Sequence, residues 1–168
     1  QVVDNTALAK AIKNGHIGGA VLDVWDHEPH IDQALLDLSL IATPHIAGYS
    51  QDGKAIGTEM SVQAVARKFC LPITDWHVKK IPAPLQPART VIDATGKTAS
   101  DIVQQAILYT YRVKTDDSIL RESPSQFEGI RSSYPVRREF AAFTIELRNA
   151  SDPGIARSLC RLGFNVEQ

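Results

Sequence analysis

The sequence predicts an α/β chain in two parts, a parallel sheet between helix layers followed by a small α+β sandwich. Three observations support this. The apolar run Gly18–Val24 fits a strand that is buried on both faces, as in a parallel sheet covered by helices. Three prolines within residues 82–87 predict an extended linker between the parts. Beyond the linker, the expected elements follow the order β-α-α-β-α-β.

The first part is predicted to alternate strands and helices. Gln1–Val3 fits a strand end, and Ala7–Lys13 fits a helix capped by Asn5-Thr6 and closed at Gly15. After the strand at Gly18–Val24, we expect a short helix at Ile31–Leu38 and a second strand at Ser39–Thr43.

A long helix is expected from Gln51 to about Leu71, ended by Pro72. Its expected apolar stripe consists of Val62, Val65, Ala66 and Phe69.

The second part is predicted to hold three strands and three helices. The strands are expected at Arg89–Ala94, Phe140–Leu147 and Phe164–Val166. The helices are expected at Ser100–Val113, at Pro124–Ser132, and from Asp152-Pro153 to Arg161 with Gly163 as its stop.

Composition excludes several classes of protein. Apolar residues make up 43% and charged residues 22% of 168 residues, with a net charge of −1, which gives no bias toward nucleic acid. No apolar run approaches the ~18 residues that span a membrane, and no secretory signal is present, so we expect a cytoplasmic protein. Cys70 and Cys160 match no metal spacing and are expected to be reduced, buried thiols; no metal site is predicted.

Two carboxylates and one imidazole follow the predicted strands of the first part. Asp23 and Glu28 follow the first strand, and His45 follows the second. The carboxyl ends of parallel strands meet at the ligand-binding edge of an open sheet. A carboxylate beside an imidazole supports proton transfer near neutral pH. Taken singly, a loop His or a strand-end Asp also fits a surface or capping role, so the residues alone leave both interpretations open.

Three segments together resemble the D-2-hydroxyacid dehydrogenase family. They are Val3–Leu8 (VDNTAL), Gly19–Pro29 (GAVLDVWDHEP) and Thr43–Tyr49 (TPHIAGY). The resemblance implies the C-terminal part of a doubly wound, Rossmann-type NAD-binding domain. It makes His45 the general acid/base and Glu28 its carboxylate partner. It places Asp23 and Gly48 near NAD, and Tyr49 near the substrate.

Further segments are similar to the branch of this family that oxidises 4-phosphoerythronate in vitamin B6 biosynthesis. They are the loop His45–Ala55, the stretch Phe127–Phe140 and the stretch Leu159–Asn165. The resemblance implies a small phosphorylated hydroxy acid as substrate and a homodimer formed through the C-terminal domain. Ile56 stands where the resemblance leads us to expect Arg, in the run Gly53–Glu59. Arg137 and Arg138 are interpreted as structural charges paired with Glu139, with contact to a substrate phosphate as the alternative.

The resemblance also predicts the domain boundaries. Residues 1–50 would complete the NAD-binding domain, 51–76 would return as a long helix toward a lid domain, 77–88 would be the linker, and 89–168 the α+β dimerisation domain. The sequence contains no G-x-G-x-x-G phosphate loop and no N-A-S-R-G segment with the family's catalytic Arg. We therefore expect a piece of a longer protein that is inactive by itself.

Two alternatives remain at this stage. One is another D-2-hydroxyacid dehydrogenase, such as a phosphoglycerate dehydrogenase, although a separation of 17 residues from Glu28 to His45 is short for these enzymes. The other is a non-catalytic dimerisation module. The position of His45 in the structure distinguishes a catalytic from a packing role. A catalytic His45 must face the same cleft as Glu28, whereas a packing His45 would be buried.

Overall fold

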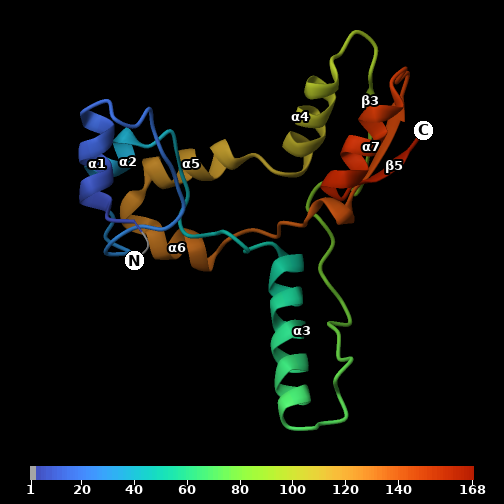
Figure 1. Cartoon of the computed structure of the whole chain (residues 1–168), viewed down its shortest axis with the longest axis horizontal. Coiled ribbons are helices and arrows are strands. Elements are labelled where there is room, and N and C mark those ends of the chain that lie inside the picture. Colours follow the sequence, from blue (N-terminus) through green and yellow to red (C-terminus); the bar gives the residue numbers. More distant parts are fainter. Residues whose placement is uncertain (1–2) are drawn as a thin grey trace. The chain divides into compact units, whose positions relative to one another are not determined.

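The computed structural model describes residues 3–168, and its contacts divide the chain into two compact units (Figure 1). Unit 1 comprises Gln1–Ala47 and Arg112–Pro135, and unit 2 comprises Gly48–Tyr111 and Val136–Gln168. The strand end predicted at Gln1–Val3 lies outside the described residues except for Val3, which is in a bend.

The sheet of unit 1 is a parallel pair, as predicted. β1 (Val21–Leu22) pairs with β2 (Ile41–Ala42), and each regular strand is two residues long. Single backbone hydrogen bonds extend the pairing, from Leu40 to Ala20 and from Thr43 to Leu22. The strand predicted over residues 18–24 was too long, because the chain turns into a loop at Asp23, whose side chain binds the loop that follows β2.

Two capped helices accompany this pair. α1 (Asn5–Lys13) begins after Asp4, whose carboxylate accepts a hydrogen bond from the backbone of Ala7. The predicted cap at Asn5-Thr6 was wrong, since Asn5 already lies in the helix. α2 (Gln33–Leu38) is capped by Asp32.

The segment 112–135 also belongs to unit 1. It forms α5 (Val113–Glu122), the 3₁₀ turn η1 (Pro124–Gln126) and α6 (Phe127–Ser132); no helix was predicted at α5. Leu120 and Phe127 are fully buried in one core with residues from the first 47 positions: Trp25, Leu35, Leu36 and Ala42. These contacts group the segment with unit 1, whereas the predicted boundaries placed it in a domain spanning 89–168.

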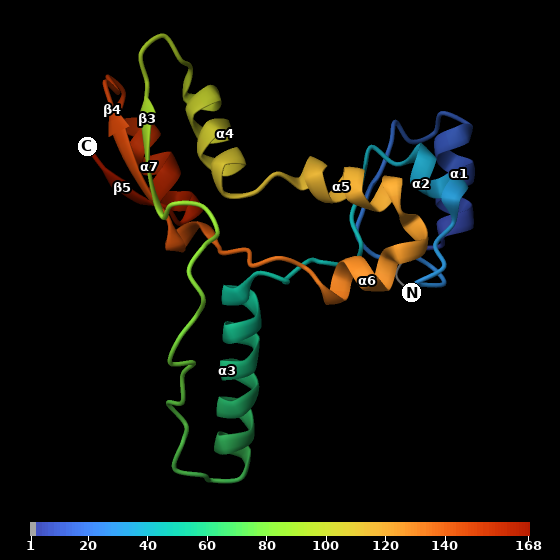
Figure 2. The same ribbon diagram turned by 180° about the vertical axis from the view of Figure 1, so that it is seen from behind.

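Unit 2 contains a three-stranded parallel sheet in the order β3-β4-β5 (Figure 2). The strands are β3 (Arg89–Asp93), β4 (Thr144–Arg148) and β5 (Asn165–Glu167), preceded at β4 by the 3₁₀ turn η2 (Phe140–Ala142). The helices α4 (Ala99–Thr110) and α7 (Pro153–Leu162) pack together over its apolar face, where Ile92, Ile145 and Leu147 are buried.

The other face of this sheet carries charged side chains. Arg89 forms ion pairs with Glu146 and Glu167, and Arg148 pairs with Glu146. The predicted Asp152 cap and Gly163 stop of α7 are confirmed, with Gly163 in the left-handed region at φ +103°.

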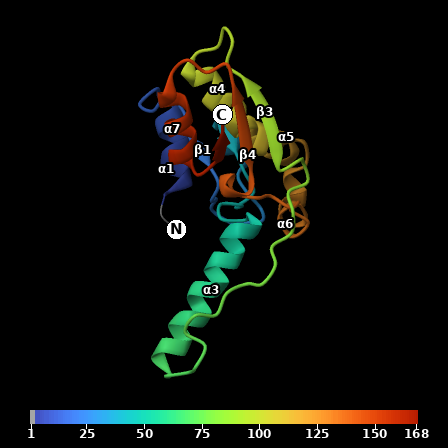
Figure 3. The same ribbon diagram turned by 90° about the vertical axis from the view of Figure 1, so that its right-hand side faces the viewer.

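Unit 2 also holds the long helix α3 (Gln51–Lys68), beside which the following segment runs back in extended form (Figure 3). Gln63 donates to the carbonyl of Trp76, and the backbone of Val78 donates to Glu59. Two of the four residues in the predicted apolar stripe are exposed, Val65 at 52% and Phe69 at 68%, whereas Val62 is half-buried and Ala66 is buried. α3 also ends before Pro72, at Lys68.

Cys70 and Cys160 are free and exposed, not buried as expected. Among residues 3–168, no helix is long and apolar enough to cross a membrane.

Candidate active site

A carboxylate and an imidazole meet at the carboxyl edge of the β1–β2 pair in unit 1. Glu28 lies in the loop after β1, and His45 lies in the loop after β2. Oε2 of Glu28 is 2.8 Å from Nδ1 of His45. The His45 side chain is 40% exposed and that of Glu28 is 19% exposed. The imidazole is therefore held by a carboxylate yet open to solvent, which is the arrangement expected of an acid–base pair and not of a packed core histidine.

The second oxygen of Glu28 is also bound. Oε1 accepts a hydrogen bond of 2.8 Å from the backbone N–H of Trp25. The buried indole N–H of Trp25 donates to the carbonyl of Thr43 at 3.0 Å, which joins the loops that carry Glu28 and His45. The sequence alone indicates a packing role for Trp25, which its burial in the unit 1 core bears out, but it does not indicate this positioning role. Its place three residues before a carboxylate, in a turn, was the available signal.

The pairing determines which ring nitrogen of His45 is available. A carboxylate only accepts hydrogen bonds, so Nδ1 carries the proton in this contact and Nε2 is the nitrogen that can face a substrate. A neutral Nε2 can accept a proton, and the neighbouring Glu28 carboxylate stabilises the imidazolium that forms. The arrangement can therefore act as a general base and, in reverse, as a general acid.

Asp23 organises the loop that presents His45. Its Oδ1 accepts from the Thr43 hydroxyl at 2.7 Å and from the backbone N–H of Ile46 at 2.8 Å, and its Oδ2 accepts from the backbone N–H of Ala47 at 3.0 Å. The prediction that Asp23 lies near a nicotinamide is not tested by these contacts. These three hydrogen bonds give Asp23 a structural role, which is to hold the loop that carries His45.

Comparison with known proteins agrees with this geometry. The family model described as "D-isomer specific 2-hydroxyacid dehydrogenase, NAD binding domain" matches residues 1–47, and "Domain of unknown function (DUF3410)" matches residues 85–166. Proteins named erythronate-4-phosphate dehydrogenase match most of the chain. The one from Pseudoalteromonas atlantica is 39% identical over 98% of this chain and 44% of its own length. The one from Bacteroides thetaiotaomicron is 43% identical over 86% of this chain and 38% of its own length.

The chain is similar to the D-isomer-specific 2-hydroxyacid dehydrogenase family over its first 47 residues, and to named dehydrogenases of that family over most of its length. It spans less than half the length of these relatives. The matches confirm the resemblance drawn from the sequence, and the family's NAD-binding region covers all three of the residues Asp23, Glu28 and His45.

Two other residues that the family resemblance assigns to the site lie in unit 2. Gly48 has φ +74°, a backbone conformation that favours glycine. Lys54 Nζ lies 4.5 Å from the ring centroid of Tyr49. The division between the units falls between Ala47 and Gly48, so the structure describes these two residues within unit 2. Their roles with NAD and substrate remain predictions.

The arginines noted in the sequence have structural partners in unit 2. Arg138 binds both oxygens of Asp52, at 2.8 and 3.0 Å, and the guanidinium carbon of Arg137 lies 4.5 Å from the ring centroid of Tyr111. Arg138 therefore pairs with Asp52 and not, as predicted, with Glu139, whose backbone N–H binds the same Asp52. Ile56, where the family branch was expected to have Arg, is 53% exposed on α3.

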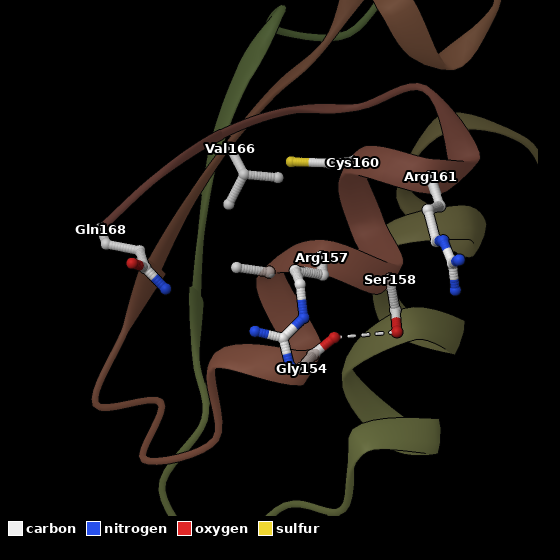
Figure 4. Close-up of a pocket in the computed structure, with 8 residues that line it drawn as sticks. Gly154, Arg157, Ser158, Cys160, Arg161, Val166 and Gln168 are labelled. Carbon is white, nitrogen blue, oxygen red and sulfur yellow. Dashed lines mark hydrogen bonds between the residues drawn. The ribbon is translucent and has the colours of Figure 1, made fainter.

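A hollow of about 840 Å³ lies on α7 and β5 in unit 2, and none of the site residues described above lines it (Figure 4). Arg157, Cys160, Arg161 and Val166 line it, and the Ser158 hydroxyl at its wall donates to the Gly154 carbonyl at 2.9 Å. None of its lining residues is Asp, Glu or His. Within residues 3–168, no group of three or more His, Cys, Asp or Glu side chains forms a metal-binding cluster.

Proposed function

We propose that the protein containing this chain is an NAD-dependent dehydrogenase that oxidises the 2-hydroxyl of 4-phospho-D-erythronate. The product would be 2-oxo-3-hydroxy-4-phosphobutanoate, in the biosynthesis of pyridoxal 5′-phosphate in the cytoplasm. The observation that carries the proposal is the 2.8 Å contact between Glu28 and His45 at the carboxyl edge of parallel strands. The names of the relatives support the choice of substrate.

The residues present fit the nicotinamide end of the cofactor. The Glu28–His45 pair stands where open parallel sheets bind their ligands, and Asp23 and Gly48 are the residues proposed to contact NAD. The 168 residues contain no G-x-G-x-x-G segment to bind the pyrophosphate. When bound, NAD would accept the hydride from the substrate. We therefore propose that the 168 residues alone neither bind NAD tightly nor turn over.

In the proposed reaction, Nε2 of His45 takes the proton of the C2 hydroxyl. The C–O bond becomes a carbonyl, and the proton stays on the imidazolium. Glu28 stabilises that charge from the Nδ1 side, which lowers the barrier to proton removal. Tyr49 is the residue proposed to contact the phosphorylated substrate.

The domain roles also remain proposals. Residues 1–50 are proposed to complete the NAD-binding domain, 51–76 to return toward a lid domain, and 77–88 to act as the linker. Residues 89–168 are proposed to form a homodimer with a second copy of the chain. Light scattering, which measures the mass in solution, would test this by distinguishing a dimer from a monomer. The packing of 112–135 in unit 1 implies that this region also supports the site-bearing unit.

A fusion tests the activity. The N-terminal portion of the Pseudoalteromonas atlantica relative is joined to residue 1, and NADH formation is followed with 4-phosphoerythronate and with 3-phosphoglycerate. We expect turnover with 4-phosphoerythronate, a loss of at least 100-fold in kcat for His45→Asn, and no turnover by the 168 residues alone. Preference for 3-phosphoglycerate would support the phosphoglycerate dehydrogenase alternative. A folded but inactive fusion would favour a non-catalytic dimerisation module.

A further inference from the structure

The peptide plane that follows His45 is held at both of its ends. Its N–H, on Ile46, donates to Oδ1 of Asp23 at 2.8 Å. Its C=O, on His45, accepts a hydrogen bond of 3.2 Å from Nε of Arg131. A peptide unit is rigid and planar, so two anchors on opposite edges fix its orientation and with it the ψ angle of His45.

His45 needs such support because its backbone is unfavourable. It has φ +55°, in the left-handed region that residues other than glycine seldom adopt, although Asn, Asp and His do so more often than the rest. A residue in this region is strained and persists where the surrounding contacts over-determine its conformation. The conformation matters for chemistry, because it sets the direction of the Cβ atom and hence the approach of the ring to Glu28.

Arg131 is itself well anchored. It lies on α6, and its side chain is only 23% exposed and paired with Glu128 at 3.1 Å. Phe127, in the first turn of the same helix, is fully buried in the core that contains Trp25. Trp25 donates to Glu28, so one core positions both the carboxylate and the arginine. The donor to His45 therefore has a fixed place relative to the acid–base pair.

We infer that Arg131 is a positioning residue for His45, supplied by the region that matches the domain of unknown function. Arg131 lies within residues 85–166, outside the match to the NAD-binding family at residues 1–47. It acts on the imidazole through the backbone. The role in turnover rests on the proposed function, whereas the role in holding the loop does not.

Arg121 provides a matched control. It comes from the same segment, and its guanidinium also donates to backbone carbonyls, those of Leu36 and Ser39 at 2.7 and 2.8 Å. These carbonyls lie at the end of α2 and not in the loop of His45. Loss of either arginine removes an anchor between the segment 112–135 and the first 47 residues, and Arg121 makes the shorter contacts and also pairs with Asp117. Only the loss of Arg131 releases the peptide after His45.

The first measurement is amide hydrogen exchange in the 168-residue chain with Arg131→Met, Arg131→Lys or Arg121→Met. We expect exchange at Ile46 and Ala47 to accelerate at least 10-fold in Arg131→Met, less in Arg131→Lys, and no more than 2-fold in Arg121→Met. Unchanged exchange at Ile46 in Arg131→Met, or equal acceleration in Arg121→Met, overturns the inference.

The second measurement is the kinetics of the fusion. We expect Arg131→Met to lower kcat about 10-fold or more, because a displaced imidazole removes the substrate proton less efficiently. KM should stay within about 2-fold, because the residues that contact the substrate are unchanged. Arg131→Lys should recover part of the loss, and Arg121→Met should keep full kcat. An unchanged kcat in Arg131→Met overturns the positioning role. Absence of activity in the unsubstituted fusion overturns the proposed function instead, and hydrogen exchange then still decides whether Arg131 holds the loop.

Discussion

The guanidinium of Arg138 donates to both carboxylate oxygens of Asp52, with Nε to Oδ2 at 2.8 Å and an NH₂ group to Oδ1 at 3.0 Å. Asp52 lies in the first turn of α3, and Arg138 lies before β4. Both side chains are 15% exposed. This two-point contact joins parts of unit 2 that are 86 residues apart in the sequence, so it helps to fix the beginning of α3.

The Asp52–Arg138 pair predicts a pH dependence of stability. Burial raises the pKa of Asp52, but hydrogen bonds from Arg138 and the Glu139 backbone outweigh it and hold the pKa below its usual 3.8. A depressed folded-state pKa contributes stability that is complete above about 3.8 and is lost as the pH falls through the lower folded-state value.

We expect Asp52→Asn to lower the free energy of unfolding by about 1–3 kcal/mol at pH 7, and by progressively less below pH ~3.8. Urea unfolding followed by circular dichroism at several pH values measures this. Asp75→Asn, in the exposed segment after α3, is the control and should change neither the stability nor its pH dependence. A difference between Asp52→Asn and the unsubstituted chain that is the same at pH 3 and pH 7 contradicts the prediction.

The packing of α5 in unit 1 predicts unequal effects at two adjacent residues. Leu120 is fully buried in the unit 1 core, whereas Ile119 is 42% exposed. Leu120→Ala should cost about 2–5 kcal/mol, because it removes buried methyl groups and leaves a cavity. Ile119→Ala should cost much less. Urea unfolding measures both, and equal costs would argue against α5 as part of this core.

Two glycines predict effects of opposite sign. Gly163 ends α7 with φ +103°, and a Cβ there would meet nothing closer than 3.9 Å, so alanine is disfavoured by the backbone alone. Gly57 lies inside α3 with no atom within 4 Å of a Cβ. We expect Gly163→Ala to destabilise by about 1 kcal/mol, and Gly57→Ala to stabilise by about 0.5–1 kcal/mol. Thermal unfolding of both variants tests this, and a stabilising Gly163→Ala is the contrary outcome.

The contact between Glu28 and His45 could be predicted from the sequence because its geometry follows from local order. Glu28 and His45 each follow a strand, the strands are parallel, and a parallel pair brings both loops to one edge. The cap of α7 at Asp152 and its stop at Gly163 were predicted for a similar reason, since each depends on residues within one turn.

What the sequence did not reveal depends on contacts between distant segments. Residues 113–122 are largely polar, and their helix is stabilised by partners far along the chain, including Arg121 on the carbonyls of Leu36 and Ser39. Arg131 and His45 are 86 positions apart, and no local pattern signals a side chain that binds another residue's backbone. The long apolar stripe of α3 was misjudged because periodicity predicts a face but not what covers it.

The charge of Glu28 predicts the effect of an isosteric change. Glu28→Gln keeps the shape of the side chain, and its amide oxygen can still accept from Trp25, but it removes the negative charge beside Nδ1 of His45. The imidazolium formed on proton removal then loses its stabilising partner. We expect kcat of the fusion to fall on the order of 100-fold or more, with little change in KM. Asp37→Asn, on the exposed face of α2, is the control and should leave kcat unchanged. A Glu28→Gln protein that retains most of its kcat would show that the carboxylate positions the ring without stabilising its charge.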